Sequence, residues 1–164
     1  MNTQQPIPSN IIFDIFGVLF HWDPLQPRIN GESQFIPIEE NIALLAECAS
    51  LINELGKPIH RLFVLSNCKL NLLEELYVAY PHVFEPFEGI VIPTHAGYAK
   101  PDKRMFEHLL ALHMLHPSNS IFIDDAPENT KAAVQLGITA ITYGPGIQLK
   151  RAFITHGVIP YTHA

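Results

Sequence analysis

Residues 11–20 read IIFDIFGVLF, and this stretch decides the fold. Its β-branched and aromatic side chains form a continuous apolar run, which predicts a short buried strand over residues 11–15. Asp14 therefore lies at the C-terminal end of that strand, just before a turn marked by Gly17. Two positions after Asp14, where a second carboxylate would be looked for, the chain has Phe16. Asp14 and Phe16 together define which chemistry is open to the protein.

Further along the chain, short apolar runs alternate with segments of helical periodicity. Apolar side chains recur at helical spacing over residues 39–55, acids occupy the first turn, and Gly56 follows the end. Pro101 is expected in the first turn of another helix. The further predicted strands are 61–65, 89–92, 120–123 and 138–142, and the further helices are 70–80, 102–115, 127–137 and 147–153. This order predicts an α/β fold, a three-layer Rossmann-like sandwich with a central parallel sheet.

Composition limits the class of protein. A chain of 164 residues with 48% hydrophobic side chains is expected to form a single domain over residues 1–164. The net charge of −6 and the lack of Lys or Arg runs argue against nucleic acid or a membrane surface as partners. Cys48 and Cys68 have no zinc-site spacing, and no segment reads as a leader or membrane span. We expect a cytoplasmic protein.

Several polar side chains follow the predicted strands at the point where each strand ends. They are Asp14, Ser66 and the pair Asp124 and Asp125, and Lys100 lies in a loop before a helix that can reach the same edge. Parallel sheets bind ligands at this edge. Paired carboxylates suit Mg²⁺, whereas a hydroxyl, an ammonium and backbone amides suit a phosphoryl group.

Each of these residues also has an ordinary structural role to consider. Asp14 alone would be a turn former, Ser66 and Asn67 would cap a helix, and Asp124 or Asp125 would cap the helix that Pro127 opens. The nine histidines offer no supported metal site, because His113 and His116 have no third ligand at a suitable spacing; we expect the histidines on the surface. The convergence of the other polar groups favours a site.

At this point the chain resembles the haloacid dehalogenase superfamily, whose four motifs occur here in order. They are FDIFGVL (13–19), VLSN (64–67), GYAKPDKRMFEHLL (97–110) and FIDDAPENTKAAVQLG (122–137). The resemblance spans residues 11–142, which is most of the chain. Each motif alone is weak, but four at compatible spacing are specific. The resemblance implies the Rossmann-like fold of this superfamily.

The resemblance also implies roles for individual residues. Asp14 would be the nucleophile and a Mg²⁺ ligand, and the backbone carbonyl of Phe16 would be a second ligand. Ser66 would bind a phosphoryl oxygen, and Lys100 would neutralise negative charge. Counting back from Asn129 makes Asp125 the main acidic metal ligand, with Asp124 in reserve.

The remaining implied contacts are with substrate. Gly17 and Asn67 belong to the first and second motifs, and His21 follows the nucleophile strand closely enough to border the site. The implied reaction is Mg²⁺-dependent hydrolysis of a small phosphorylated substrate through an aspartyl-phosphate.

Phe16 departs from the pattern of the superfamily's phosphatases, where an aspartate at this position protonates the leaving group. Phenylalanine keeps the backbone carbonyl but provides no proton, so alkyl phosphates should react slowly, and aryl or acyl phosphates should suffer less. One alternative is a catalytically lapsed domain that binds a phosphorylated ligand or a partner protein. Another is a 2-haloacid dehalogenase, although Asp124 and Asp125 would then place negative charge beside an attacking carboxylate.

The motif spacing leaves little room for a lid. Residues 20–38 are the only segment available for a cap, so we expect the cap to be absent or to be a small flap, formed by a loop with a small hairpin. An open site excludes water poorly. A large substrate or a second copy of the chain would then complete it.

Overall fold

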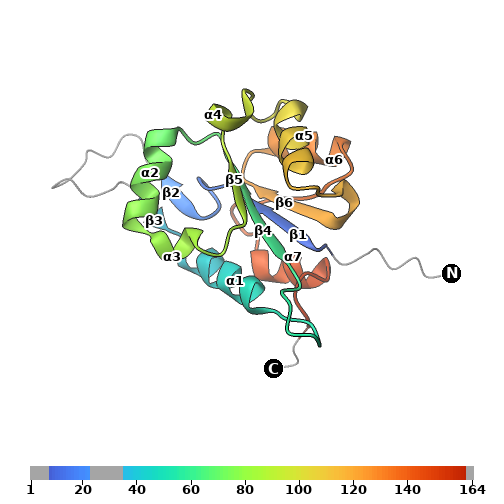
Figure 1. The fold of residues 1–164 in the computed structure, drawn as a ribbon. Coiled ribbons are helices and arrows are strands. Elements are labelled where there is room, and N and C mark those ends of the chain that lie inside the picture. The colour runs from blue at the N-terminus through green and yellow to red at the C-terminus, as the bar shows by residue number, and fades with distance from the viewer. Residues whose placement is uncertain (1–7, 23–34, 162–164) are drawn as a thin grey trace.

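The computed structural model describes residues 8–22 and 35–161, and a parallel sheet forms its centre (Figure 1). The sheet has five strands in the order β5-β4-β1-β6-β7, all of them parallel. The strands are β1 (Asn10–Phe13), β4 (Arg61–Leu65), β5 (Gly89–Val91), β6 (Ser120–Asp124) and β7 (Thr139–Thr142). β1 therefore lies in the middle, and all four of its residues are buried, as the apolar run that starts at Ile11 predicts. This confirms the predicted α/β fold with a central parallel sheet.

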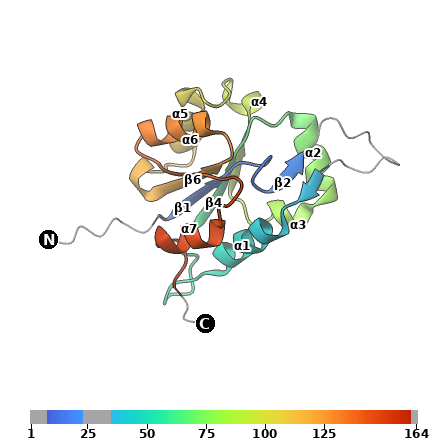
Figure 2. The same cartoon turned by 180° about the vertical axis from the view of Figure 1, so that it is seen from behind.

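Helices cover both faces of this sheet, so the described part of the chain has three layers. One face carries α5 and α6, and the opposite face carries α1 and α7 (Figures 1 and 2). The helices are α1 (Glu39–Ser50), α2 (Leu70–Ala79), α3 (Pro81–Phe84), α4 (Pro93–Ala96), α5 (Lys103–Leu112), α6 (Pro127–Gln135) and α7 (Leu149–Thr155), with a 3₁₀ turn at Pro117–Asn119. Within the described residues, no helix has the length and apolar character needed to cross a membrane.

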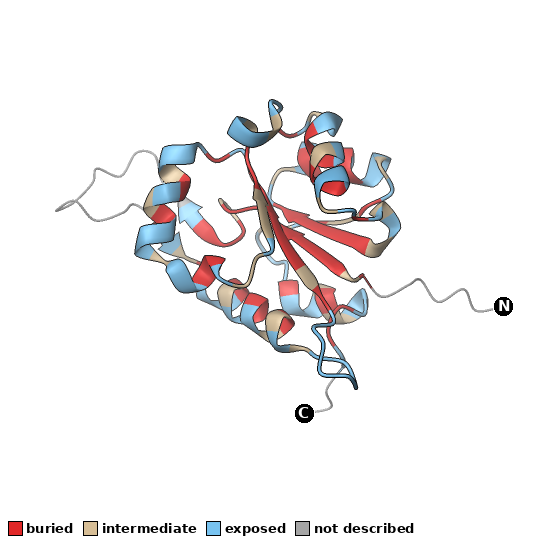
Figure 3. Cartoon of the chain, in the orientation of Figure 1, coloured by how far each residue is buried: buried red, intermediate tan, exposed pale blue. Residues whose placement is uncertain are grey.

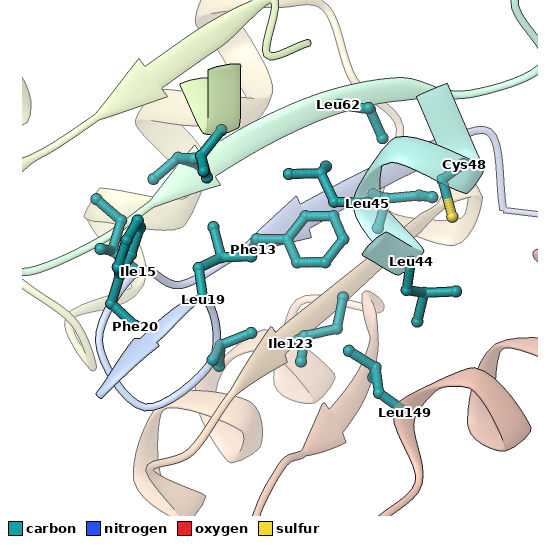
Figure 4. Packing of buried hydrophobic residues seen from close by; sticks show 14 of the residues in the cluster. Phe13, Ile15, Leu19, Phe20, Leu44, Leu45, Cys48, Leu62, Ile123 and Leu149 are labelled. Carbon is teal, nitrogen blue, oxygen red and sulfur yellow. The ribbon is translucent and has the colours of Figure 1, made fainter. Parts of the chain in front are cut away.

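Alternate residues of the central strands feed two separate hydrophobic cores. Phe13 of β1 packs with Leu44, Leu45 and Leu149 on the α1 and α7 side, as Figure 4 shows. Ile12, the neighbouring residue, packs instead against α5 and α6 on the other face. Burial follows this arrangement, because β1 and β6 are fully buried, the edge strands β5 and β7 are only partly buried, and the outer faces of the helices are exposed (Figure 3). Burial on both faces explains the continuous apolar run in the sequence.

A small antiparallel pair of strands lies beside the main sheet. β2 (Phe20–Trp22) pairs with β3 (Phe35–Pro37), and His21 is directly opposite Ile36. The Tyr80 hydroxyl donates a hydrogen bond to the Phe35 carbonyl at 3.0 Å, which attaches β3 to the end of α2. Residues 23–34 of the expected flap lie outside the described residues. The flanking segments do form the hairpin that the sequence suggested.

The predicted ends of several helices differ from the structure, and two of these differences have a clear local cause. α1 ends at Ser50, not at residue 55, because Asn53 accepts hydrogen bonds from the Leu55 and Lys57 amides and turns the chain. The other helix, α5, begins at Lys103 with Asp102 as its N-cap, so Pro101 precedes the helix and is not in its first turn. Sequence reasoning also missed α4 and α3 as separate short helices.

The amino ends of the strands carry buried polar side chains that are fully paired. Asn10 donates to the Ser120 hydroxyl at 3.2 Å, and that hydroxyl donates to the His116 carbonyl at 2.9 Å. His60 is 4% exposed, and its two ring nitrogens lie 3.0 Å from the Pro8 carbonyl oxygen and 2.7 Å from that of Val158. The expectation that the histidines lie on the surface is therefore wrong for His60.

Candidate active site

The carboxyl ends of β1 and β6 bring three carboxylates together. Asp14 follows β1, Asp124 is the last residue of β6, and Asp125 comes next in the chain. One oxygen from each side chain lies within 4.8 Å of the others. From β1 the chain forms β4 and β5 on one side of the sheet and then crosses to form β6 and β7 on the other side. The strand order therefore reverses between the neighbouring strands β1 and β6, and open parallel sheets bind ligands at such a point. The predicted convergence of these three acids is observed.

The Lys100 ammonium lies among these acids. Its Nζ is 2.5 Å from an Asp124 oxygen and 3.1 Å from an Asp14 oxygen, and it donates to the Leu65 carbonyl at 2.8 Å. Lys100 is only 5% exposed, so these contacts replace nearly all of its hydration. A buried ammonium requires such partners, because an unpaired buried charge is strongly unfavourable. The three carboxylates nevertheless outnumber this one buried positive charge.

Asp124 is occupied by protein contacts. Besides the Lys100 ion pair, it accepts hydrogen bonds from the Ala126 amide at 2.8 Å and from the Asn129 side chain at 3.1 and 3.0 Å. It is completely buried, and it is not among the residues that line the adjacent cavity. Its carboxylate therefore orients Lys100 and the start of α6.

Asp125 differs from its neighbour, since it is exposed and lines the cavity. Its carboxylate lies against Gly17, where any β-carbon would collide with it. Gly17 also has φ +79°, a conformation that glycine adopts without strain. Its amide donates to the Phe20 carbonyl at 2.8 Å, so it closes the turn after β1. Gly17 thus provides the space that lets Asp125 approach Asp14.

The crowding of negative charge changes the acidity of the group that would react. Burial raises the pKa of Asp14 to about 6; the positive charge of Lys100 opposes this rise, and the negative charge of Asp124 adds to it. A hydrogen bond from Ser66 also lowers the pKa of Asp14. The pKa of Asp125 is raised by burial and by Asp124. This excess of carboxylates favours a cation in the site.

The second motif lies at the end of β4. Ser66 is buried, and its hydroxyl accepts a hydrogen bond from the Cys68 amide at 3.3 Å. The Asn67 side chain donates to the Lys100 carbonyl at 2.9 Å and accepts from the Lys100 amide at 2.8 Å. The amide group of Asn67 thus holds the backbone of Lys100, and Asn67 also lines the cavity, so its contact with substrate stays a prediction.

A cavity of about 620 Å³ opens beside these groups. It brings together all the predicted site residues except Asp124: Asp14, Phe16, Gly17, His21, Ser66, Asn67, Lys100 and Asp125, together with Asn129. Sequence reasoning had given no site role to four further lining residues, Ile36, Cys68, Lys69 and Leu72. The last three lie just after Ser66, in the residues that lead into α2 and in its first turn. Their closeness to the second motif could have predicted that they line the site. Ile36 reaches the cavity only because β3 pairs with β2.

The fold, the four motifs and this cluster of acids define a class of protein. A model of the family described as haloacid dehalogenase-like hydrolase matches residues 11–143. This match covers most of the chain, so the protein belongs to the haloacid dehalogenase-like hydrolases.

Solved structures show the same fold. A haloacid dehalogenase family enzyme from Bacteroides thetaiotaomicron, in complex with magnesium and inorganic phosphate, has a TM-score of 0.72 at 18% identity, over 88% of this chain and 98% of that one. A structure described as a predicted HAD-like family hydrolase from Porphyromonas gingivalis has a TM-score of 0.65 at 22% identity, over 92% of this chain and 98% of that one.

Two relatives of known name are also similar in sequence. A sesquiterpene phosphatase from Aspergillus oryzae is 25% identical over an alignment 171 positions long, which covers 79% of this chain and 87% of that protein. Acyl-CoA dehydrogenase family member 10 from Mus musculus is 42% identical over 55 residues, 34% of this chain. The matched segment is 5% of that mouse protein, so the chain spans only a small part of its length.

Proposed function

We propose that this protein is a Mg²⁺-dependent phosphatase that acts through an aspartyl-phosphate on Asp14. The observation that carries the proposal is the cluster of three carboxylates around the buried Lys100 ammonium, at the edge of a cavity. The Bacteroides enzyme of the same fold, solved with magnesium and inorganic phosphate, supports the same ligands here.

The residues present fit a magnesium ion. Asp14 and Asp125 border the cavity and offer the oxygen ligands that Mg²⁺ prefers, and together with Asp124 they carry more negative charge than Lys100 balances. We assign the metal to these two carboxylates and to the Phe16 backbone carbonyl. Asp124 is given the role of holding Lys100, because its oxygens already accept hydrogen bonds from three partners. When bound, the ion supplies charge neutralisation for the carboxylates and the phosphoryl oxygens.

The chain's own residues account for the reaction. An Asp14 carboxylate oxygen forms a bond to phosphorus, and the bond from phosphorus to the leaving oxygen breaks with its electron pair going to that oxygen. Lys100 and the Ser66 hydroxyl lie beside Asp14 and stabilise charge on the phosphoryl group. Water then hydrolyses the aspartyl-phosphate, which releases inorganic phosphate and restores the carboxylate.

Phe16 limits this chemistry to good leaving groups. A phenylalanine side chain cannot donate a proton to the departing oxygen, a contribution of about a hundredfold to ten-thousandfold when an acid is present. Leaving groups that are stable as anions depend less on this proton. Aryl and acyl phosphates are therefore the substrates that this site would hydrolyse fastest.

The test is phosphate release from acetyl phosphate and phenyl phosphate, with Mg²⁺ or with EDTA. Activity should require Mg²⁺ and should disappear in Asp14→Asn, because an amide cannot form the acyl-phosphate. Glu54→Gln is the matched control, since it removes an exposed carboxylate that does not line the cavity, and it should behave as wild type. Activity that survives in Asp14→Asn would contradict the mechanism.

A second candidate is a lapsed domain that binds a phosphorylated ligand without turnover. Phe16 favours it, because the ring stacks on Phe35 at a centroid distance of 5.5 Å and thus belongs to the packing of the β2–β3 hairpin. This candidate predicts calorimetric binding of Mg²⁺ and inorganic phosphate with no release of phosphate from any ester or acyl phosphate. Metal-free release of halide from 2-haloacids would instead indicate a dehalogenase.

A further inference from the structure

The cavity has two chemically different sides. Asp14, Asp125 and Lys100 form the charged side described above. The other side is apolar and comes from three separate elements: Phe16 after β1, Ile36 of β3 and Leu72 of α2. Because these positions are far apart in the sequence, the apolar side exists only in the folded chain. We call Phe16, Ile36 and Leu72 the apolar wall.

Packing behind the apolar wall fixes its position. The Phe16 ring stacks on Phe35 with an interplanar angle of 25°. Phe35 is itself buried, and its carbonyl accepts the hydrogen bond from Tyr80 that attaches β3 to the end of α2. The three elements of the wall are therefore held to one another independently of any ligand. A preformed apolar surface of this kind is typical of small-molecule sites.

The wall also leaves apolar surface in contact with water. Ile36 is 64% exposed although it borders the cavity, and Leu72 is half-buried. Covering such surface with an apolar ligand is favourable by roughly 25 cal/mol per Å². A polyhydroxylated leaving group such as a sugar would gain nothing here, because its hydroxyl groups would lose hydration against these side chains.

The position of the wall gives it a specific part of the substrate. Phe16 is two residues from the nucleophile Asp14, at the place where related phosphatases have the acid that protonates the leaving group. A group bound against Phe16 is therefore the leaving group, and it must be both apolar and stable as an anion. Phenols combine these properties, and their flat rings suit the face of a phenylalanine.

We propose that the apolar wall selects aromatic phosphomonoesters, binding the aryl leaving group against Phe16, Ile36 and Leu72. This inference rests on the proposed function and goes further, since it names the substrate class and two determinants, Ile36 and Leu72, outside the four motifs.

The experiment compares kcat/KM for 1-naphthyl phosphate with kcat/KM for acetyl phosphate, which has a good leaving group but no ring. The ratio of the two constants should fall by about tenfold in Ile36→Ser and in Leu72→Asn, because each removes apolar surface from the pocket. Val78→Asn is the control: Val78 is also on α2, is 85% exposed and does not line the cavity. Its ratio should equal that of wild type.

The outcomes separate the two levels of the proposal. If neither substrate releases phosphate, the proposed function fails and the aryl specificity fails with it. If acetyl phosphate is hydrolysed but the ratio is unchanged in Ile36→Ser and Leu72→Asn, the proposed function stands and the apolar wall is not the determinant.

Two further measurements use the wild-type protein, so they do not depend on whether a variant folds. 1-Naphthol should inhibit competitively, and no inhibition would contradict binding at the wall. In a series of aryl phosphates, kcat/KM should rise steeply as the leaving phenol becomes more acidic. A flat dependence would overturn the proposal, because the leaving oxygen would then receive a proton from another group, for which His21, which also lines the cavity, is the candidate.

Discussion

The two ends of the central sheet treat buried polar groups in opposite ways. At the amino ends, Asn10 and Ser120 form a closed set of hydrogen bonds, and His60 lies between two carbonyl groups. At the carboxyl ends, Asp14, Asp124 and Asp125 surround Lys100, and negative charge remains in excess. The first arrangement balances its polar groups within the protein, whereas the second leaves an excess of negative charge that could hold a cation.

This difference separates polar groups that stabilise the fold from the carboxylates that we propose to act in catalysis. Paired buried polar groups cost little, but neighbouring like charges raise each other's pKa and oppose folding. The pKa of Asp14 is raised to about 6, mainly by burial and further by the negative charge of Asp124. Perturbed acidity of this kind is typical of functional sites. The comparison can be tested at both ends of the sheet.

The largest expected effect separates the two adjacent acids of the carboxyl end. Asp124→Asn removes one partner of the buried ion pair with Lys100, and the free energy of unfolding should fall by about 3 kcal/mol. Asp125→Asn relieves repulsion at an exposed carboxylate, so stability should stay near that of wild type while Mg²⁺ binding weakens. Urea unfolding and calorimetric Mg²⁺ titration of both variants provide the measurement. The reverse pattern would make Asp124 the metal ligand.

The second largest effect is expected at Phe16, which replaces the acid that protonates the leaving group in related phosphatases. Phe16→Asp should raise the rate with an alkyl phosphate such as glycerol phosphate by about a hundredfold relative to acetyl phosphate, because the leaving oxygen then receives a proton. The loss of the Phe16–Phe35 stack should lower stability at the same time. Phe16→Asn is the matched control, since it removes the same ring without supplying an acid. Equal rates in the two variants would show that the acid is not what limits turnover.

The smallest effect is at the amino end. Burial lowers the pKa of His60, although the two carbonyl contacts oppose this. The unfolded chain therefore takes up the proton at higher pH than the folded protein does. The contribution of the neutral His60 to the free energy of unfolding is fully present above the unfolded pKa of about 6.5. It decreases as the pH falls below that value, by at most about 1.4 kcal/mol per pH unit.

His60→Gln should remove this part of the pH dependence, because a glutamine does not titrate. Its stability should fall less than that of wild type between pH 7 and pH 5.5, as measured by the urea midpoint. The exposed His156 provides the control variant, His156→Gln, which should keep the wild-type slope. A wild-type slope in His60→Gln would mean that other groups carry the pH dependence.

The order of strands and helices was predictable because the relevant signals are local. Apolar runs marked the strands, and Gly17, together with the acid after β1, marked the site. The end of α1 was not predictable from periodicity, since Leu51, Ile52 and Leu55 continue the apolar pattern beyond Ser50. Ile52 and Leu55 are in fact exposed, and the Asn53 side chain turns the chain there.

The candidate site was predictable as a set of residue types but not as a set of roles. The sequence shows two adjacent acids, yet only the structure shows that Asp124 is enclosed by donors and Asp125 faces the cavity. In the same way, the pairing of Asn67 with the backbone of Lys100 and the arrival of Ile36 at the cavity depend on tertiary contacts. Such contacts leave no periodic trace in the sequence.

The Lys100 ammonium touches the ends of three neighbouring strands: Asp14 after β1, the Leu65 carbonyl of β4, and Asp124 of β6. It is thus a structural cross-link as well as the charge that we propose for catalysis. A descendant of this protein that lost its activity would still need that cross-link to fold. The presence of Lys100 is therefore poor evidence of turnover in related chains, and the residue at the position of Phe16, where an acid would supply a proton to the leaving group, is the more telling one to inspect.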